Sequence, residues 1–293
     1  MRRVFLFLAT NFAIIFILGI VAHLLGADRF LTSQGLDLSA LLVFSFIFGM
    51  GGSIISLQIS RWSAKRMMRC QVITDPRTST EQWLHSTVKR LTREAGLPMP
   101  ELAVFPGTAP NAFATGPGRN RSLVAVSTGL LNNMNQDQVE AVLAHEVSHI
   151  RSGDMVTLAL IQGVVNTFVF FFARVVGYAV DAALSRGQDR SGPGIGYFLG
   201  TIIAQIFFSI LASTIVFWFS RKREFRADHG AAQLSGREKM ISALEVLGKP
   251  VASQPLPESM AAFGISGKRA GSFGRLFMTH PPIEERIRAL KEM

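Results

Sequence analysis

The sequence contains a single cysteine, Cys70, among its 293 residues. One cysteine excludes an intrachain disulfide, and with no second cysteine nearby Cys70 is a poor zinc ligand. We interpret it as a structural or incidental thiol. Acidic residues are also scarce, with 20 Asp and Glu against 30 Lys and Arg, so the net charge is +10. The sequence has no nucleic-acid-binding motif, and its basic residues cluster at the ends of apolar runs, so we expect no nucleic-acid partner.

Long apolar runs are what the sequence has in excess. Mean hydropathy is +0.31 and 48% of the residues are hydrophobic. Each run reaches the roughly 20 residues that cross a bilayer core, and the four runs cover about 4–25, 38–58, 156–180 and 195–219. The first run follows Arg2 and Arg3, as in a signal peptide, but it is too long for one and no clean cleavage site closes it. We predict four transmembrane helices, the first an uncleaved anchor.

Basic residues at the ends of these runs predict an orientation. Lys and Arg precede the first run and follow the second and the fourth, whereas the loops at 26–37 and 181–194 carry both signs. By the positive-inside rule the basic ends and both termini face the cytoplasm. The predicted organisation is therefore two transmembrane helices in 1–61, the first part of a cytoplasmic domain in 62–155, two further transmembrane helices in 156–220 and the second part of the domain in 221–293.

The segments between the runs mix helix and strand patterns. We expect short strands at 102–105, 111–115 and 122–126 and amphipathic or short helices at 77–97, 223–234, 237–247 and 282–291. A stretch with Pro and Gly, about 249–274, is expected to be a loop. The predicted fold class is α+β: a mostly helical integral membrane protein with four transmembrane helices and a cytoplasmic domain that contains a small β-sheet.

The sequence His145-Glu146-Val147-Ser148-His149 is an HExxH motif, preceded by residues that favour a helix. Four residues apart on a helix, His145 and His149 share one face and can bind one metal ion. Glu146 lies about 100° further round, beside the open metal position where a general base is needed. A metzincin would continue with Gly and His, but Ser152 and Met155 stand there. The third ligand is then a carboxylate or another of the six histidines.

Glu224 and Asp228 are candidates to complete this site. Four apart on a predicted helix, they can supply one zinc ligand and one carboxylate that holds a ligating imidazole by its free N–H. Two histidines and one glutamate would leave the fourth position to water, as in catalytic zinc sites. The spacing alone also fits solvated helix charges beside Arg223 and Arg226.

In their order along the chain, these motifs resemble the HtpX family of membrane-bound zinc metalloproteases. The resemblance is carried by the HEVSH motif, Glu224 to Asp228, Thr279-His280-Pro281-Pro282 and Asn111-Ala112-Phe113-Ala114-Thr115-Gly116. This family belongs to the gluzincins and is related to the CAAX prenyl-protein proteases. The resemblance implies a zincin-like metalloprotease domain with one Zn²⁺ per subunit. It implies His145, His149 and Glu224 as metal ligands, Glu146 as the base and Asp228 as the partner of a ligating histidine.

Two assignments keep alternatives. His280 is a candidate for stabilising the oxyanion, or it is an ordinary residue at the start of the last helix. Asn111, Ala112, Phe113, Ala114 and Thr115 are candidates for an edge strand that pairs with an extended substrate, or they form a strand of the sheet core.

We therefore expect a zinc-dependent endopeptidase that cleaves polypeptides, in particular misfolded or damaged membrane proteins, at the cytoplasmic face of the bilayer. The resemblance implies a bacterial inner-membrane enzyme of protein quality control. One alternative is a membrane zinc-binding scaffold or inactive relative, which would not need Glu146. Another is a transporter with an incidental motif, although no charge-lined path through the runs is visible. The oligomeric state is left open.

Overall fold

The computed structural model describes residues 16–18, 20, 23–24, 29–32, 35–185, 193–248 and 280–293. Three helices in these ranges are long and apolar enough to cross a membrane: Leu38–Met68, Asp154–Ser185 and Ile195–Ser235. They contain the second, third and fourth predicted runs. Most of the first predicted run, about 4–25, and the predicted loop, about 249–274, lie outside the described residues. The structure thus supports three of the four predicted spans by length and composition.

The chain divides into two compact units. The first, here called the apolar unit, comprises Met1–Ser56 and Leu158–Val216. The second, here called the site unit, comprises Leu57–Thr157 and Phe217–Met293. Each unit is assembled from two separate stretches of the chain, so the long helices pass from one unit into the other.

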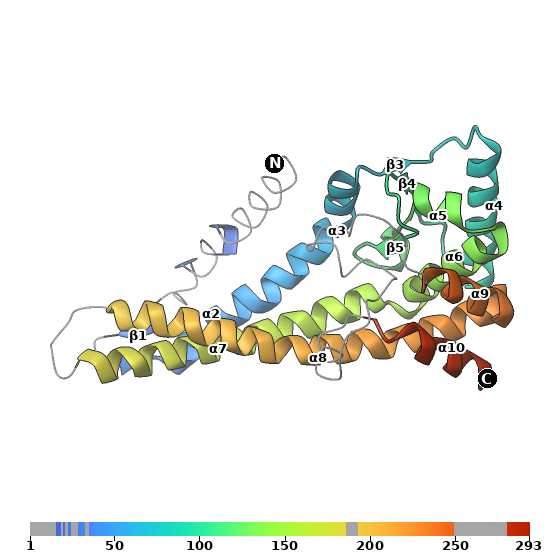
Figure 1. Ribbon diagram of the computed structural model, residues 1–293. Helices are drawn as coiled ribbons and strands as arrows, with labels where there is room; N and C mark the ends of the chain where they lie inside the picture. Colours follow the sequence, from blue (N-terminus) through green and yellow to red (C-terminus); the bar gives the residue numbers. More distant parts are fainter. Residues whose placement is uncertain are drawn as a thin grey trace. The chain divides into compact units, whose positions relative to one another are not determined.

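The apolar unit is built from closely packed helices: α2 (Leu38–Phe46), the π-helix η1 (Ile47–Gly51), the start of α3 (Gly52–Met68), and the apolar parts of α7 (Asp154–Ser185) and α8 (Ile195–Ser235). A two-stranded hairpin of β1 (Leu31–Thr32) and β2 (Gly35–Leu36) precedes them. Small residues allow the contacts: a Cβ on Gly49 would lie 2.4 Å from the Thr167 backbone N. Figure 1 shows α7 and α8 side by side, and Gly177 packs against Thr201 where they meet. Such contacts replace the hydrophobic driving force that lipid does not provide.

The site unit contains a four-stranded mixed sheet in the order β3–β4–β6–β5. Its strands are β3 (Gln71–Val72), β4 (Glu101–Phe105), β5 (Ala112–Thr115) and β6 (Leu123–Ser127). β4 and β6 are parallel, whereas β3 and β5 pair antiparallel at the two edges. Three of these strands lie within one residue of their predicted positions, and the prediction of a mostly helical chain with a small sheet is confirmed. The sequence did not indicate β3.

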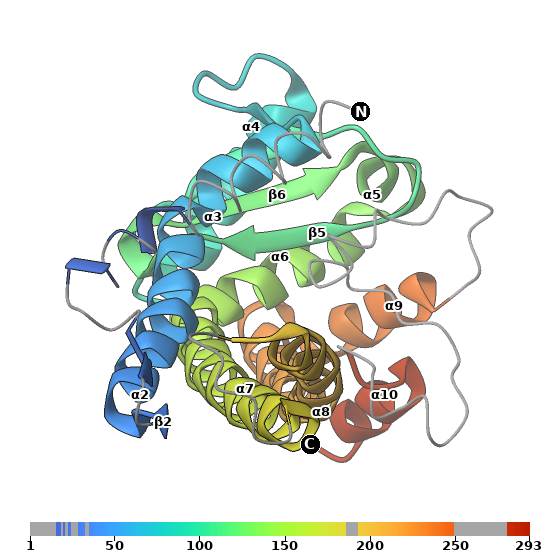
Figure 2. The same cartoon turned by 90° about the vertical axis from the view of Figure 1, so that its left-hand side faces the viewer.

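Helices cover both faces of this sheet. On one face lie α4 (Ser79–Glu94), α5 (Thr128–Asn133) and α6 (Gln136–Ser152), followed by α9 (Arg237–Leu247) and α10 (Ile283–Lys291). On the other face, Ala64 and Met68 of α3 pack against Phe105 and Phe113. A short 3-10 turn, η2 (Arg119–Arg121), connects β5 to β6. Figure 2 shows α6 running along β5 and β6, so the helix that carries the HExxH motif lies at the centre of the unit.

Candidate metal centre

The helix α6 is well defined at both ends. The Asn135 side chain accepts a hydrogen bond from the Gln138 backbone N–H, and the Gln138 side chain accepts one from the Asn135 backbone N–H. The two bonds form a capping box. At the other end Gly153 adopts φ 68°, a left-handed conformation that glycine tolerates best. Between these caps His145 and His149 project from one face, and their Nε2 atoms lie 3.1 Å apart. Two imidazole nitrogens this close need a proton or a cation between them.

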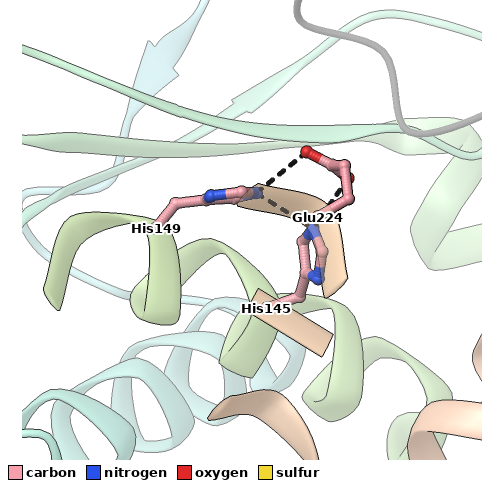
Figure 3. A group of neighbouring side chains, drawn as sticks. All are labelled: His145, His149 and Glu224. Carbon is pink, nitrogen blue, oxygen red and sulfur yellow. Dashed lines mark hydrogen bonds and ion pairs between the residues drawn. The ribbon is translucent and has the colours of Figure 1, made fainter. Parts of the chain in front are cut away.

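Glu224 reaches both histidines from α8. Its Oε2 is 3.5 Å from His145 Nε2, and its Oε1 is 3.4 Å from His149 Nε2. Figure 3 shows the three side chains converging on one point. The close approach of the two helices depends on Gly230, where a Cβ would lie 2.6 Å from Ser148 Oγ. A larger residue at this position would push α8 away from α6. Gly230 therefore helps to keep Glu224 close to the two histidines.

The spacing of these three groups fits a zinc ion. Zinc bonds of about 2.0–2.1 Å in a tetrahedron place neighbouring ligand atoms about 3.3–3.4 Å apart. The two Nε2 atoms are 3.1 Å apart, His145 Nε2 is 3.5 Å from Glu224 Oε2, and His149 Nε2 is 3.4 Å from Glu224 Oε1. With one ligand atom taken from each residue, the three atoms lie within 4.8 Å of one another. Two imidazoles and one carboxylate are also a donor set that zinc accepts. His145, His149 and Glu224 could therefore hold a metal ion.

Each histidine has a carboxylate on its other ring nitrogen. His145 Nδ1 lies 2.9 Å from Asp228 Oδ1, and His149 Nδ1 lies 2.7 Å from Asp154 Oδ2. This arrangement directs both Nε2 atoms toward the common point. The sequence had singled out Asp228 but not Asp154. The available signal was the position of Asp154 directly after Gly153, a helix-ending glycine that turns the chain back toward His149.

Arg286 was also missed from the sequence. It is fully buried on α10, where Nη2 and Nε make two ion-paired hydrogen bonds to Asp228, and its Nη1 lies 3.6 Å from Glu224 Oε2. Its neighbours along the helix, Ile287 and Leu290, pack into the core. An arginine on the apolar face of an amphipathic helix was the signal that could have identified it.

His280 lies at the same centre. The His280 Nδ1 is 2.8 Å from Glu224 Oε2, so this side chain contacts the third candidate ligand. His280 is not at the first turn of α10, which begins at Ile283. Glu146 is buried on α6 beside His145. The candidate ligands, the candidate base, Asp228 and His280 all belong to the site unit, and so do Asp154 and Arg286.

The charges of the site favour a cation. Burial would raise the pKa of Glu224, but the charge of His280 and hydrogen bonds from His145, His149 and His280 hold it well below its usual value. Burial likewise opposes ionisation of Asp228, yet Arg286 and His145 lower its pKa to about 2. Both carboxylates are therefore ionised at neutral pH. Burial disfavours the charged form of His149, but hydrogen bonds to Asp154 and Glu224 raise its pKa to about 10, so a metal would displace a proton there.

The candidate substrate strand lies next to α6. Among the described strands, β5 pairs with β6 alone, and it packs against α6. The Ser127 N–H donates to the Asn111 carbonyl at 2.8 Å, and Ala112 faces Val126 in the register. Because hydrogen-bonded pairs alternate in an antiparallel ladder, Phe113 and Thr115 bond toward β6. The backbone N–H and C=O groups of Ala112 and Ala114 then point away from β6, toward the edge.

The comparisons with known proteins agree in the family that they indicate. Residues 78–293 match the family described as Peptidase family M48. The chain is 59% identical to "Protease HtpX" of Thioalkalivibrio sulfidiphilus over 295 residues, which cover 100% of this chain and 99% of that protein. It is 56% identical to "Protease HtpX homolog" of Nitrosomonas europaea over 293 residues, which cover 99% of each chain.

One solved structure shows the same fold. Ste24p of S. mikatae superposes with a TM-score of 0.64 at 17% sequence identity, covering 99% of this chain and 66% of that chain. The resemblance inferred from the motifs is confirmed by the family match and the close relatives. The chain therefore belongs to peptidase family M48 and is a metalloprotease of the HtpX type.

Proposed function

We propose that this protein is a zinc-dependent endopeptidase whose centre is formed by His145, His149 and Glu224. The observation that carries the proposal is the convergence of their donor atoms: the two Nε2 atoms are 3.1 Å apart and each lies within 3.5 Å of a Glu224 oxygen. With one atom taken from each residue, the three lie within 4.8 Å of one another, close enough to surround one ion. Glu146, buried on the same helix, is the proposed general base, which a zinc-binding scaffold would not need. One Zn²⁺ per subunit would supply a Lewis acid that activates water and polarises the scissile carbonyl.

The residues of the chain then have distinct roles. Glu146 takes a proton from the attacking water and later delivers it to the leaving amine. Asp228, whose Oδ1 lies 2.9 Å from His145 Nδ1, is the proposed partner that directs His145 Nε2 toward the metal position. His280, held beside Glu224, is the proposed donor that stabilises the negative charge on the carbonyl oxygen.

We propose that an extended substrate pairs with Asn111 to Thr115. The support is that β5 is an outer strand of the described sheet, packs against α6 and directs the backbone groups of Ala112 and Ala114 to the edge. Main-chain hydrogen bonds at this edge would hold a polypeptide without demanding a particular side chain. Such recognition suits an enzyme that cleaves many unfolded segments.

The proposed location is the bacterial inner membrane, with the active site and both termini in the cytoplasm. Three helices are long and apolar enough to span a bilayer, and Lys and Arg are concentrated at the ends of the apolar runs assigned to the cytoplasm. Glu224 lies on α8 and Asp154 begins α7, so two of the long helices lead directly into the centre. The proposed substrates are therefore misfolded or damaged membrane proteins, whose cytoplasmic segments come within reach, and the proposed role is quality control.

Glu146→Gln tests the proposal. Purified full-length protein should retain about one zinc per chain but lose cleavage of a model membrane protein, because an amide cannot act as the base. Asp137→Asn, an exposed change on the same helix, is the matched control and should cleave normally. Equal turnover by Glu146→Gln and wild type would contradict the assignment. Zinc binding by wild type without any cleavage would favour the scaffold alternative.

A further inference from the structure

Asp154 is a buried carboxylate in contact with a proposed ligand. Its Oδ2 lies 2.7 Å from His149 Nδ1, and the side chain is 3% exposed. The contact has the same form as that of Asp228 with His145, so each histidine of the pair has its own acidic partner. The two partners come from different parts of the chain, since Asp228 lies within α8 whereas Asp154 begins α7.

A carboxylate at this position controls the ring of His149. An Nδ1–H that donates to Asp154 fixes the tautomer whose Nε2 carries the free electron pair, and it fixes the rotation of the ring. The Nε2 of His149 points to the common point, 3.1 Å from His145 Nε2. Without Asp154, the side chain of His149, which is more exposed than that of His145, would have no such restraint on its far nitrogen.

Asp154 is itself held by the turn of α8 that carries Glu224. The Arg223 Nη1 donates to the Asp154 backbone carbonyl at 3.4 Å, and the Arg226 Nη2 lies 3.6 Å from Asp154 Oδ1. Arg226 is 60% exposed, so its ion pair alone contributes little. Together the two contacts join the start of α7 to the turn of α8 that carries Glu224.

We propose that Asp154 is a positioning residue of the metal centre, which orients His149 and, through Arg223 and Arg226, fixes the start of α7 to the Glu224 turn of α8. The inference rests on the proposed role of His149 as a ligand. The contacts of Asp154 would fix the junction of α6 and α7. At this junction one glycine, Gly153, separates the HExxH helix from a helix long enough to cross a membrane.

The test uses purified full-length protein and Co²⁺ as a spectroscopic probe. Asp154→Ala should bind Co²⁺ and Zn²⁺ about 10–100-fold more weakly in competition with a chelator, the usual effect of removing such a partner. Its cobalt absorption bands should shift, and kcat should fall with little change in KM, because no substrate contact is removed. Asp154→Asn should recover part of the affinity, since an amide oxygen can still accept the Nδ1–H. Asp137→Asn on α6 should match wild type in all three measurements.

A second measurement separates positioning from folding. The thermal unfolding of the metal-free protein should be similar in Asp154→Asn and Asp154→Ala, which both lack the carboxylate charge, while their metal affinities differ. Wild-type affinity and an unchanged cobalt spectrum in Asp154→Ala would overturn the proposal, even if the enzyme itself is confirmed. Equal affinity losses in the Asn and Ala variants, accompanied by equal losses of metal-free stability, would also overturn it. If the wild type binds neither metal, the proposed function fails together with this inference.

Discussion

Arg286 on α10 and Asp228 on α8 form a buried bidentate ion pair, with Nη2–Oδ1 and Nε–Oδ2 distances of 2.6 and 2.7 Å. The pair joins the last described helix to the carboxylate that contacts His145. A buried carboxylate is tolerated only when such partners offset the loss of hydration. The geometry of the proposed centre therefore depends on a helix that contributes no proposed ligand.

Replacing Arg286 should destabilise the protein and weaken metal binding. Arg286→Met leaves Asp228 buried without its main counter-charge, and breaking a buried pair in this way costs about 3–5 kcal/mol. Thermal unfolding of the metal-free protein in detergent, with zinc analysis, measures both effects. Arg288→Met, on the exposed face of α10, is the control and should change neither. Wild-type stability in Arg286→Met would show that Asp228 is compensated by other groups.

The stability of the metal-free protein should fall in acid because of Asp228. Arg286 and His145 overcome the effect of burial and lower the pKa of this carboxyl to about 2, against about 3.9 for an unperturbed aspartate. A depressed folded-state pKa stabilises the protein above the unfolded pKa, and this contribution is lost as the pH falls from about 4 to 2. The expected contribution is about 2 kcal/mol. Unfolding measured at pH 6 and pH 3 should show a smaller acid loss in Asp228→Asn than in wild type.

Glu224→Ala should abolish most zinc binding, whereas Asp228→Ala should reduce the affinity by about 10–100-fold. The first change removes a proposed ligand, and the second removes only the partner of one. Metal content after dialysis and chelator competition distinguish the two. Glu238→Ala, an exposed change on α9, should bind zinc like wild type. Unchanged zinc occupancy in Glu224→Ala would refute its role as the third ligand.

Ala114→Pro should impair substrate binding more than folding. The register directs the Ala114 N–H away from β6, so proline removes an edge donor and spares the ladder. We expect KM to rise, or cleavage to stop, at near-normal zinc content and thermal stability. Ala114→Ser should be nearly silent, and Phe113→Pro should unfold the sheet because the Phe113 N–H bonds toward β6. Normal cleavage by Ala114→Pro would place the substrate elsewhere, and its unfolding would make the strand part of the core.

The orientation can be tested by labelling. In a Cys70-free background, cysteines at Ser33 and Ser191, which lie outside the described residues, should react with an impermeant thiol reagent in intact cells. A cysteine at Ser86, exposed on α4, should react only after the cells are permeabilised. The reverse pattern would move the proposed active site to the other side of the membrane.

Local patterns predicted the elements that depend on nearby residues. The spacing of His145 and His149 on a helix and that of the pair Glu224 and Asp228 follow from the helical period of 3.6 residues. Other features depend on residues distant in sequence. β3 has two residues and exists through its pairing with β4, and the roles of Asp154 and Arg286 become visible only when their partners are in place.

Hydropathy also gave the apolar runs but not the ends of the helices. The fourth run was predicted to end at about 219, with a separate helix beginning at 223. The structure has one helix, α8, from Ile195 to Ser235. The residues between them, Arg221 and Lys222 among others, are good helix formers, so the backbone continues while the side chains change from apolar to charged. A change of polarity marks where a bilayer would end and need not mark the end of a helix.

The order of the ligands along the chain has a consequence for biosynthesis. His145 and His149 are made before α7 and α8, whereas Glu224 lies in the C-terminal part of α8, and His280 and Arg286 follow that helix. At roughly 5–20 residues per second, about 4–15 s separate the synthesis of His149 from that of Glu224. The nascent chain thus holds only half of the metal centre while the α7–α8 hairpin is still being made. With the proposed ligands, the metal centre cannot be completed before the α7–α8 hairpin has been made, so we expect no cleavage by the nascent chain until then.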